Sequence, residues 1–206
     1  MELKEQLKPF DFDPERFTHR RWTYDELLEE LPETNSPIEL WEGEFVLSPS
    51  PSFFHQKLID RFHDRLKAWV QPRGLGETCM APMDMILTQL HVTQPDVLFV
   101  GKDRLHIIQD RIRGPADLVL EVISPGSRQR DRIEKRDLYE QHGIQEYWII
   151  DPDARMIEVL HLDAGEYRLA GRWHPGDTAR SRLLEGFTVS VSNLFEPLPG
   201  KGTPPC

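Results

Sequence analysis

Two acidic residues and a lysine in the middle of the chain have types and spacing suited to phosphate chemistry. Asp96 directly precedes the apolar run VLFV, and Glu121 lies inside the run LVLEVI. Lys135 follows in a segment with a helical pattern. Two carboxylates on neighbouring strands suit Mg²⁺, which often takes one or two protein carboxylates and keeps several waters. A nearby ammonium group can hold the attacking water or a phosphate oxygen. These residues therefore predict a metal-dependent centre that cleaves phosphodiester bonds.

Each of these residues also has a purely structural interpretation. An ionised side chain inside an apolar strand is costly unless it is paired or binds a metal. Glu121 could therefore be a carboxylate at the open end of a sheet, salt-bridged to an arginine or lysine. Lys135 could be a solvated helix residue paired with Asp131. The residue pattern alone leaves these alternatives open.

The helix expected over residues 128–142 has to bring Lys135 to the strand that carries Glu121. One stripe of this helix carries residues at intervals of three or four positions. The stripe consists of Asp131, Lys135, Tyr139 and His142. Because Tyr139 is a natural packing residue, we expect the stripe to face the sheet. Strand alternation places Glu121 on the same face of its strand as Val119.

Apolar periodicity and turn residues divide the rest of the chain into short elements. Two further helices are expected, one at about Tyr24–Leu31 with a Thr23–Glu26 capping box and one from an N-cap at Ser52 to just before Pro72. Strands are expected at Ile38–Leu47 (a hairpin turning at Gly43), Thr78–Met80, Met83–Leu87, Val97–Val100, Leu118–Ile123, Ile144–Ile150, Met156–Leu162 and Tyr167–Gly171. Residues 101–116 are expected to form a loop. The strand–helix–strand order around residues 118–150 predicts a parallel crossover, hence an α/β or mixed α+β class with a central mixed β-sheet flanked by helices.

Length, charge and cysteine content limit the classes of protein that fit. The 206 residues suit one domain, here placed at residues 21–195, with an N-terminal arm at 1–20 and a flexible tail at 196–206. The net charge of −10 argues against a broad basic surface for nucleic acid, although it permits a local one. The two cysteines are far apart, which argues against a zinc site. No apolar run is long enough for a signal peptide or a membrane span, so a soluble, cytoplasmic protein is expected.

Four blocks of sequence, in this order, resemble a known bacterial family. They are ELWEGEFVLSPSPSFFHQ, QPDVLFV, LVLEVISPGS and EKRDLYEQHGIQEYWIIDP. They look like the Uma-two family of restriction-endonuclease-like proteins, which is similar to the PD-(D/E)XK nuclease superfamily. The resemblance runs from about Arg21 to Val191, and it implies a restriction-endonuclease-like fold.

The resemblance also implies roles for individual residues. It implies that Asp96, Glu121 and the backbone carbonyl of Val122 are metal ligands for Mg²⁺ or Mn²⁺. The superfamily pattern places its lysine two positions after the glutamate, but Ile123 stands there, so Lys135 on the following helix is implied as the catalytic lysine. The residues expected to support this site are Glu39, Glu44, His55, Asp84, Gln94 and Tyr139. A first-turn helix histidine such as His55 is, by itself, more often a capping or surface residue.

Three functions follow from these observations. The first is a Mg²⁺-dependent DNA endonuclease that acts as a homodimer, because cleavage of both strands needs two sites. Arginines that bracket the site would contact DNA, although ordinary solubility also explains them. They are Arg128, Arg130 and Arg132, with Arg111, Arg113 and Arg136 beyond. The second function is a non-catalytic nucleic-acid-binding or interaction protein on the same fold, which Ile123 favours. The third is a metal-dependent hydrolase of small phosphoesters.

Overall fold

The computed structural model describes residues 20–30, 38–47, 50–124 and 126–198. The expected N-terminal arm, except Arg20, and the end of the expected tail lie outside these residues. The core is a six-stranded sheet in the order β11-β10-β9-β8-β6-β3. Its strands are β3 (Gly76–Met80), β6 (Val97–Gly101), β8 (Leu118–Val122), β9 (Glu146–Asp151), β10 (Met156–Asp163) and β11 (Glu166–Trp173). The sheet is mixed, because β8 and β9 are parallel while the other neighbours are antiparallel.

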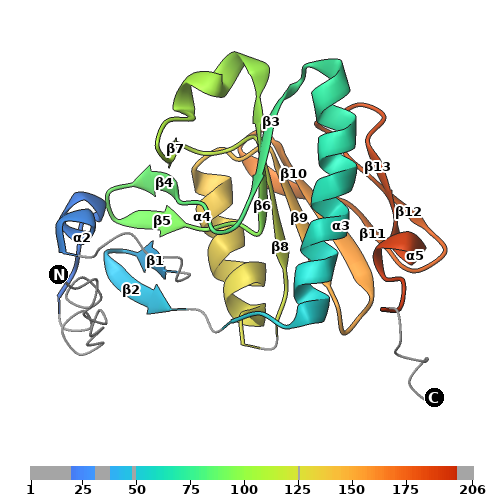
Figure 1. Ribbon diagram of the computed structural model, residues 1–206, viewed down its shortest axis with the longest axis horizontal. Coiled ribbons are helices and arrows are strands. Elements are labelled where there is room, and N and C mark those ends of the chain that lie inside the picture. The colour runs from blue at the N-terminus through green and yellow to red at the C-terminus, as the bar shows by residue number, and fades with distance from the viewer. Residues whose placement is uncertain (1–19, 31–37, 48–49, 125, 199–206) are drawn as a thin grey trace, which may run out of the picture.

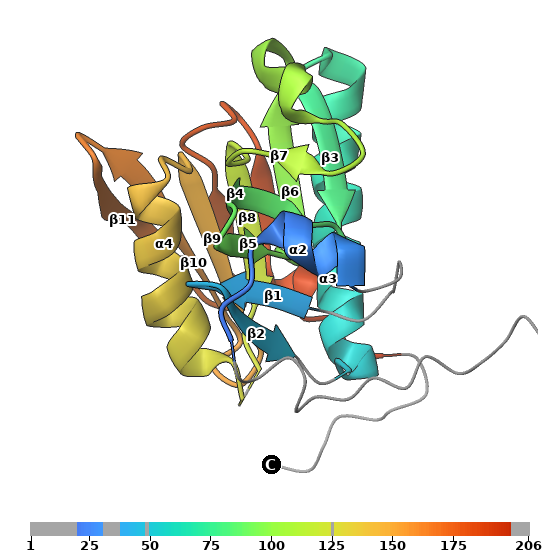
Figure 2. The ribbon, with the colours of Figure 1, turned by 90° about the vertical axis from the view of Figure 1, so that its left-hand side faces the viewer.

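One helix covers each face of this sheet (Figures 1 and 2). Helix α3 (Phe53–Val70) packs its apolar stripe on one face, where Phe62 lies 5.2 Å from the Trp148 ring, centroid to centroid. Helix α4 (Lys135–Gln141) covers the other face, where Tyr139 meets the Tyr147 ring at 5.2 Å. Strand β8 is buried along its whole length because it lies between both helices. Any polar group on β8 is therefore removed from bulk water.

A second, smaller sheet lies beside α4 (Figure 1). Its order is β2-β1-β5-β4-β7, with helix α2 (Tyr24–Glu30) packed against it. Its strands are β1 (Ile38–Trp41), β2 (Glu44–Leu47), β4 (Met85–Thr88), β5 (His91–Thr93) and β7 (Ile112–Arg113). Residues 94–96 connect β5 of this sheet directly to β6 of the main sheet. Side chains of β1 thereby come close to β8.

The remaining elements are a two-stranded sheet and a short helix on the face of the main sheet that α3 covers, and two 3₁₀ segments. A two-stranded sheet is formed by β12 (Thr178–Arg180) and β13 (Thr188–Ser190), and the short helix α5 (Val191–Leu194) follows it. Two 3₁₀ segments, η1 (Gln71–Arg73) and η2 (Lys102–Ile107), lie after α3 and β6. No described helix combines the length and the apolar character that crossing a membrane requires.

Most of the expected elements are confirmed. The Thr23–Glu26 capping box forms, with the Thr23 N–H donating to Glu26 at 2.8 Å. Ser52 caps α3 through the N–H of His55. The β1–β2 and β10–β11 hairpins and the parallel β8–β9 crossover are present. The α+β class with a mixed sheet between helices is therefore confirmed.

The region between β3 and β8 was predicted less well. The expected strand at Met83–Leu87 begins two residues later, and it pairs with β5, which was not predicted. Residues 101–116, expected to be a loop, contain η2 and β7. These elements are two to six residues long and gain their stability from the neighbouring strands, so they have little periodicity of their own.

The helix predicted over residues 128–142 is not uniformly α-helical. Arg130–Glu134 forms a π-helical turn, here called the π-turn, before α4 begins at Lys135. Such π-helical turns are rare in proteins, and those that occur are often found at functional sites. The π-turn buries Asp131 while leaving Ile133 exposed to solvent. It sets the rotation at which Asp131 and Lys135 face β8.

Candidate active site

Glu121 and Lys135 meet in the interior, between β8 and α4. The Nζ atom of Lys135 donates to Oε1 of Glu121 at 2.8 Å, and the Tyr139 hydroxyl donates to the same oxygen at 2.8 Å. Both side chains of the pair are nearly inaccessible, with 5% of Glu121 and 7% of Lys135 exposed. Lys135 is thus a buried partner of Glu121, not a solvated helix lysine.

Two more carboxylates surround the same ammonium group. Oε1 of Glu39, on β1, lies 3.0 Å from Nζ of Lys135, and Oδ1 of Asp131, in the π-turn, lies 4.0 Å from it. We call Glu39, Glu121, Asp131 and Lys135 the buried ion cluster. All four are buried. With every carboxyl group ionised, three negative charges would face one positive charge.

This imbalance governs the protonation of the ion cluster. Burial raises the pKa of Glu121 well above its usual value; Lys135 opposes this, while Asp96, Asp131 and Glu39 add to it. Burial likewise raises the pKa of Asp131. Burial alone would lower the pKa of Lys135, but the surrounding carboxylates outweigh it and raise that pKa. The site therefore holds protons more tightly than the unfolded chain does, and it favours added positive charge.

Glu39 is held in place by a side chain of its own strand and by the segment that joins the two sheets. Its Oε1 accepts the backbone N–H of Gln94 at 2.9 Å, and its Oε2 accepts the indole N–H of Trp41 at 3.3 Å. Gln94 opens the segment that joins the small sheet to the main one. Buried carboxylates need hydrogen-bond donors, and these two donors fix the position of the Glu39 carboxylate beside Lys135.

Asp96 lies at the rim of the ion cluster. Its Oδ2 accepts the backbone N–H of Val122 at 2.7 Å, which ties the start of β6 to the end of β8. The Nε2 atom of His55, from the first turn of α3, lies 3.5 Å from the same oxygen. The side chains of Asp96 and His55 are 17% and 14% exposed, more than those of the ion cluster. The site therefore opens to solvent on the side of Asp96 and His55.

Asp84 and Gln94 form a separate network behind the rim. Asp84 accepts hydrogen bonds from the Tyr24 hydroxyl at 2.6 Å and from the Gln94 amide at 2.7 Å. The Arg111 guanidinium lies 3.4 Å from the same carboxylate. This network links α2 and β4 to Gln94, so Asp84 supports the backbone that holds Glu39 and does not enter the ion cluster.

The structure leaves Glu44 outside the site. Glu44 is exposed on β2, although Glu39 on the paired strand β1 is buried. The two residues lie on the same face of the hairpin, because Glu44 pairs with Trp41, which shares the face of Glu39. Glu44 is nevertheless exposed because β2 is the edge strand of the small sheet, whereas β1 lies between β2 and β5. Of the two acidic residues considered in that hairpin, only Glu39 contacts Lys135.

The arginines expected to contact DNA are mostly engaged in ion pairs. Arg128 and Arg132 lie 2.7 Å and 3.1 Å from Oδ2 of the buried Asp151, and Arg130 lies 3.9 Å from Glu134. Beyond them, Arg113 pairs with Asp110 at 3.4 Å, and Arg136 is exposed on α4. Arg128 and Arg132 anchor the π-turn to the end of β9, which is a structural use of their charge.

The carboxylates of the site are possible ligands for a divalent cation. Among the described residues, no three His, Cys, Asp or Glu side chains are grouped so as to hold a metal ion. Mg²⁺, however, commonly takes one or two carboxylates and completes its octahedron with water and substrate oxygens. Asp96 and Glu121 supply two hard oxygen donors beside a surplus of negative charge. The chemistry of these two donors therefore fits Mg²⁺ or Mn²⁺.

Sequence reasoning missed Asp131 as a member of the site and Trp41 as a support for Glu39. The sequence places Asp131 on the stripe that faces the sheet but assigns it no role beyond pairing with Lys135, and nothing in the local sequence distinguishes a π-turn from an α-helix. Trp41 lies two residues after Glu39 and so shares its strand face, a signal that could have been used. The sequence did place Asp131, Lys135 and Tyr139 on one stripe, and all three face β8. His142 ends the stripe, and the centroid of its ring lies 6.3 Å from that of His91.

Comparison with known proteins agrees with this architecture. The model of the Uma2 family, described as "Putative restriction endonuclease", matches residues 24–192. The comparison with curated proteins gives no match. Among solved structures, the crystal structure of a putative nuclease belonging to DUF820 from Anabaena variabilis ATCC 29413 is similar, with a TM-score of 0.71 and 22% identity. The match covers 84% of this chain and 97% of the other.

The family match spans all the residues of the candidate site, from Glu39 on β1 to Tyr139 on α4. The structural match shows the same fold over most of both chains. The chain therefore belongs to the Uma2 family of restriction-endonuclease-like proteins.

Proposed function

We propose that this protein is a Mg²⁺- or Mn²⁺-dependent endonuclease that hydrolyses phosphodiester bonds of DNA. The observation that carries the proposal is the surplus of carboxylate over ammonium in the ion cluster, next to Asp96 at the solvent-open rim. A bound divalent cation would neutralise charge on a phosphate group and would lower the pKa of a water molecule. Asp96 and Glu121 are the proposed ligands, and the carbonyl of Val122 is a proposed third oxygen.

The residues of the chain have distinct proposed roles. Lys135 supplies an ammonium group held by Glu121 and Glu39, and it would orient the attacking water or a phosphate oxygen. Tyr139 fixes Glu121 through its hydroxyl group, so we propose it as a positioning residue. His55 lies at the rim, with its Nε2 atom 3.5 Å from the Asp96 carboxylate, so we propose it as a positioning residue for Asp96. The described residues form one candidate site, and cleavage of both strands would need two such sites, so we propose a homodimer.

A second function is favoured by a specific observation. Lys135 already has two carboxylate partners within 3.0 Å, which is how a purely structural buried ion cluster is satisfied. A non-catalytic nucleic-acid-binding or interaction protein would use the ion cluster only to join the two sheets. The two functions predict different responses to Mn²⁺ and to a charge-removing substitution at Asp96.

Substitution Asp96→Asn tests the nuclease proposal without removing a hydrogen bond from the fold. The asparagine side-chain oxygen can still accept the Val122 N–H, but the charge available to a cation is lost. We expect nicking of supercoiled plasmid in Mn²⁺ to fall by about 100-fold or more, and Mn²⁺ binding measured by calorimetry to weaken. Thermal unfolding in EDTA should change little.

Asp64→Asn on the exposed surface of α3 is the matched control, because it removes the same charge far from the rim. It should nick plasmid within about twofold of the unsubstituted protein. Equal activity of the Asp96 and Asp64 variants would contradict the proposed role of Asp96. A wild-type protein that neither binds Mn²⁺ nor nicks DNA would favour the non-catalytic function.

A further inference from the structure

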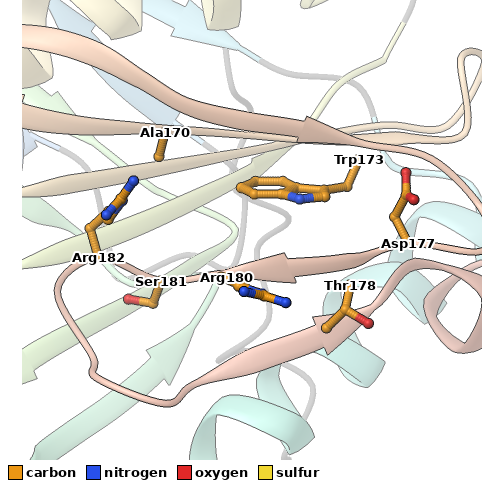
Figure 3. A pocket seen from close by; sticks show the side chains of 7 residues that line it. All are labelled: Ala170, Trp173, Asp177, Thr178, Arg180, Ser181 and Arg182. Carbon is orange, nitrogen blue, oxygen red and sulfur yellow. The ribbon is translucent and has the colours of Figure 1, made fainter.

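A hollow of about 540 Å³ lies between β11 and β12, on the face of the main sheet opposite the ion cluster. Figure 3 shows the indole of Trp173 extending along the space between the two strands, with Arg180 and Arg182 on the opposite side. Its volume falls in the range of small-molecule sites, roughly 300–1,000 Å³. None of these three residues belongs to the candidate active site.

The geometry of β11 directs Trp173 into the hollow. Pairing with β10 shifts register between Val159 and Leu160, so that Val159 faces Gly171, Leu160 faces Leu169, and Ala170 is an extra residue. Such bulges re-aim side chains. A Cβ atom at Gly171 would lie 2.4 Å from the Trp173 ring, so the indole can occupy this position only because residue 171 is glycine.

The opposite wall presents two arginines from the same face of one extended segment. Thr178, Arg180 and Arg182 alternate with the inward-facing Ala179 and Ser181, and the three alternating residues are exposed. Ser181 donates to the fully buried Glu146 at 2.7 Å, and the N–H of Arg182 donates to it at 2.5 Å. Because Glu146 holds this segment from the inside, the wall is already formed without a ligand.

Neither guanidinium group is used by the protein itself. Within the described ranges, Arg180 and Arg182 lie within ion-pair distance of no carboxylate, unlike Arg128 and Arg132. In the same part of the chain, no arginine or aromatic ring stacks on Trp173, whereas Arg73 stacks on Trp69 at 3.6 Å and Arg20 on Trp22 at 3.5 Å. The hollow thus combines an indole on which no described arginine or aromatic ring stacks with two arginines outside any ion pair, in a chain whose net charge is −10. Its lining also includes one carboxylate, Asp177, which accepts the backbone N–H of His174 at 2.9 Å.

We propose that this hollow binds a nucleoside phosphate, with the base stacked on Trp173 and the phosphate held by Arg180 and Arg182. Planar bases stack on aromatic side chains, and arginine forms paired hydrogen bonds to phosphate oxygens. The same chemistry is offered by a free nucleotide and by a nucleotide of single-stranded DNA. This site does not depend on the proposed nuclease activity, because it lies on the other face of the sheet.

The test is binding of AMP and of a fluorescein-labelled single-stranded oligonucleotide in EDTA, which keeps divalent cations away. We expect quenching of tryptophan fluorescence by AMP, or an increase in oligonucleotide anisotropy, in the wild-type protein. The double variant Arg180→Ala/Arg182→Ala and the variant Trp173→Leu should each weaken binding by about 10-fold or more. Gly171→Ala should also weaken it, because the added methyl group displaces the indole without altering charge.

Arg168→Ala is the matched control, since Arg168 is an exposed arginine of β11 that does not line the hollow. It should leave affinity within about twofold. Saturation by AMP alone identifies a free nucleotide, and tighter binding of the oligonucleotide identifies single-stranded DNA; either result supports the site. Absence of binding at millimolar AMP and micromolar oligonucleotide overturns it, as does equal weakening by Arg168→Ala and by the double variant. Circular dichroism of each variant separates lost binding from lost folding.

Discussion

Glu121→Gln is expected to abolish metal-dependent nicking of DNA while leaving the protein folded. Glutamine has nearly the same shape and can still accept hydrogen bonds from Lys135 and Tyr139. It cannot provide the negative charge that a cation needs, so we expect the rate to fall by about 100-fold or more. Removing one of three carboxylates also relieves repulsion, so the melting temperature should stay the same or rise. Plasmid nicking in Mn²⁺ and thermal unfolding measure the two effects.

The pH dependence of the wild-type protein gives an independent readout of Glu121. Because burial raises the pKa of Glu121 above its usual value, a proton competes with the cation as pH falls through that raised pKa. We expect Mn²⁺ affinity to rise as pH increases through the folded-state pKa, and we expect Glu121→Gln to remove that part of the slope. Glu77→Gln, at an exposed position of β3, is the control for both measurements. A Glu121→Gln variant as active as this control would exclude Glu121 from the chemistry.

Lys135→Met is expected to have the largest effect on stability. Methionine preserves most of the side-chain volume, but the substitution leaves Glu39, Glu121 and Asp131 buried together without a counter-charge. Removing one partner of a buried ion pair costs about 3–5 kcal/mol. We expect a loss of that size in the free energy of unfolding at pH 8, measured in urea, together with loss of nicking activity.

The pH dependence of this loss has a definite sign. Lys135 is the largest influence that opposes the upward shift of the Glu121 and Asp131 pKa values, so without it the native state binds protons still more tightly than the unfolded chain. Stability gained in this way is present at low pH and is lost as pH rises through the folded-state pKa values. The deficit should therefore shrink toward pH 5, and Mn²⁺ should reduce it at pH 8.

Lys102→Met, at an exposed position of η2, removes the same charge and should change stability by less than about 0.5 kcal/mol. A deficit of Lys135→Met that stayed constant from pH 5 to pH 8 would contradict unbalanced burial of the carboxylates. In that case lost packing of the lysine stem would account for the effect.

The sequence was most informative where several local signals agreed. The apolar run around Glu121, the stripe through Lys135 and the turn at Gly143 together predicted a β8–α4–β9 unit, which the structure contains. Gly143 has a φ of 76°, as expected after a helix end. The same signals predicted that Lys135 faces Glu121.

The sequence was least informative where position depends on distant parts of the chain. Glu39 enters the site because residues 94–96 join the two sheets, and the Gln94 N–H fixes its carboxylate. No local pattern distinguishes Glu39 from Glu44 as the buried member of the hairpin. The pairing of Arg128 and Arg132 with Asp151 likewise depends on the end of β9, which lies far along the chain.

The π-turn at Arg130–Glu134 makes the site sensitive to chain length as well as to residue type. A π-turn holds one residue more than the α-helical turn it replaces. Because each residue of an α-helix advances by about 100°, loss of a single residue here would rotate the preceding backbone by roughly that angle. Lys135 would keep its contact with Glu121, but Asp131 would turn away from it. A single-residue deletion in this segment would therefore remove Asp131 from the ion cluster even if every side chain of the cluster were kept.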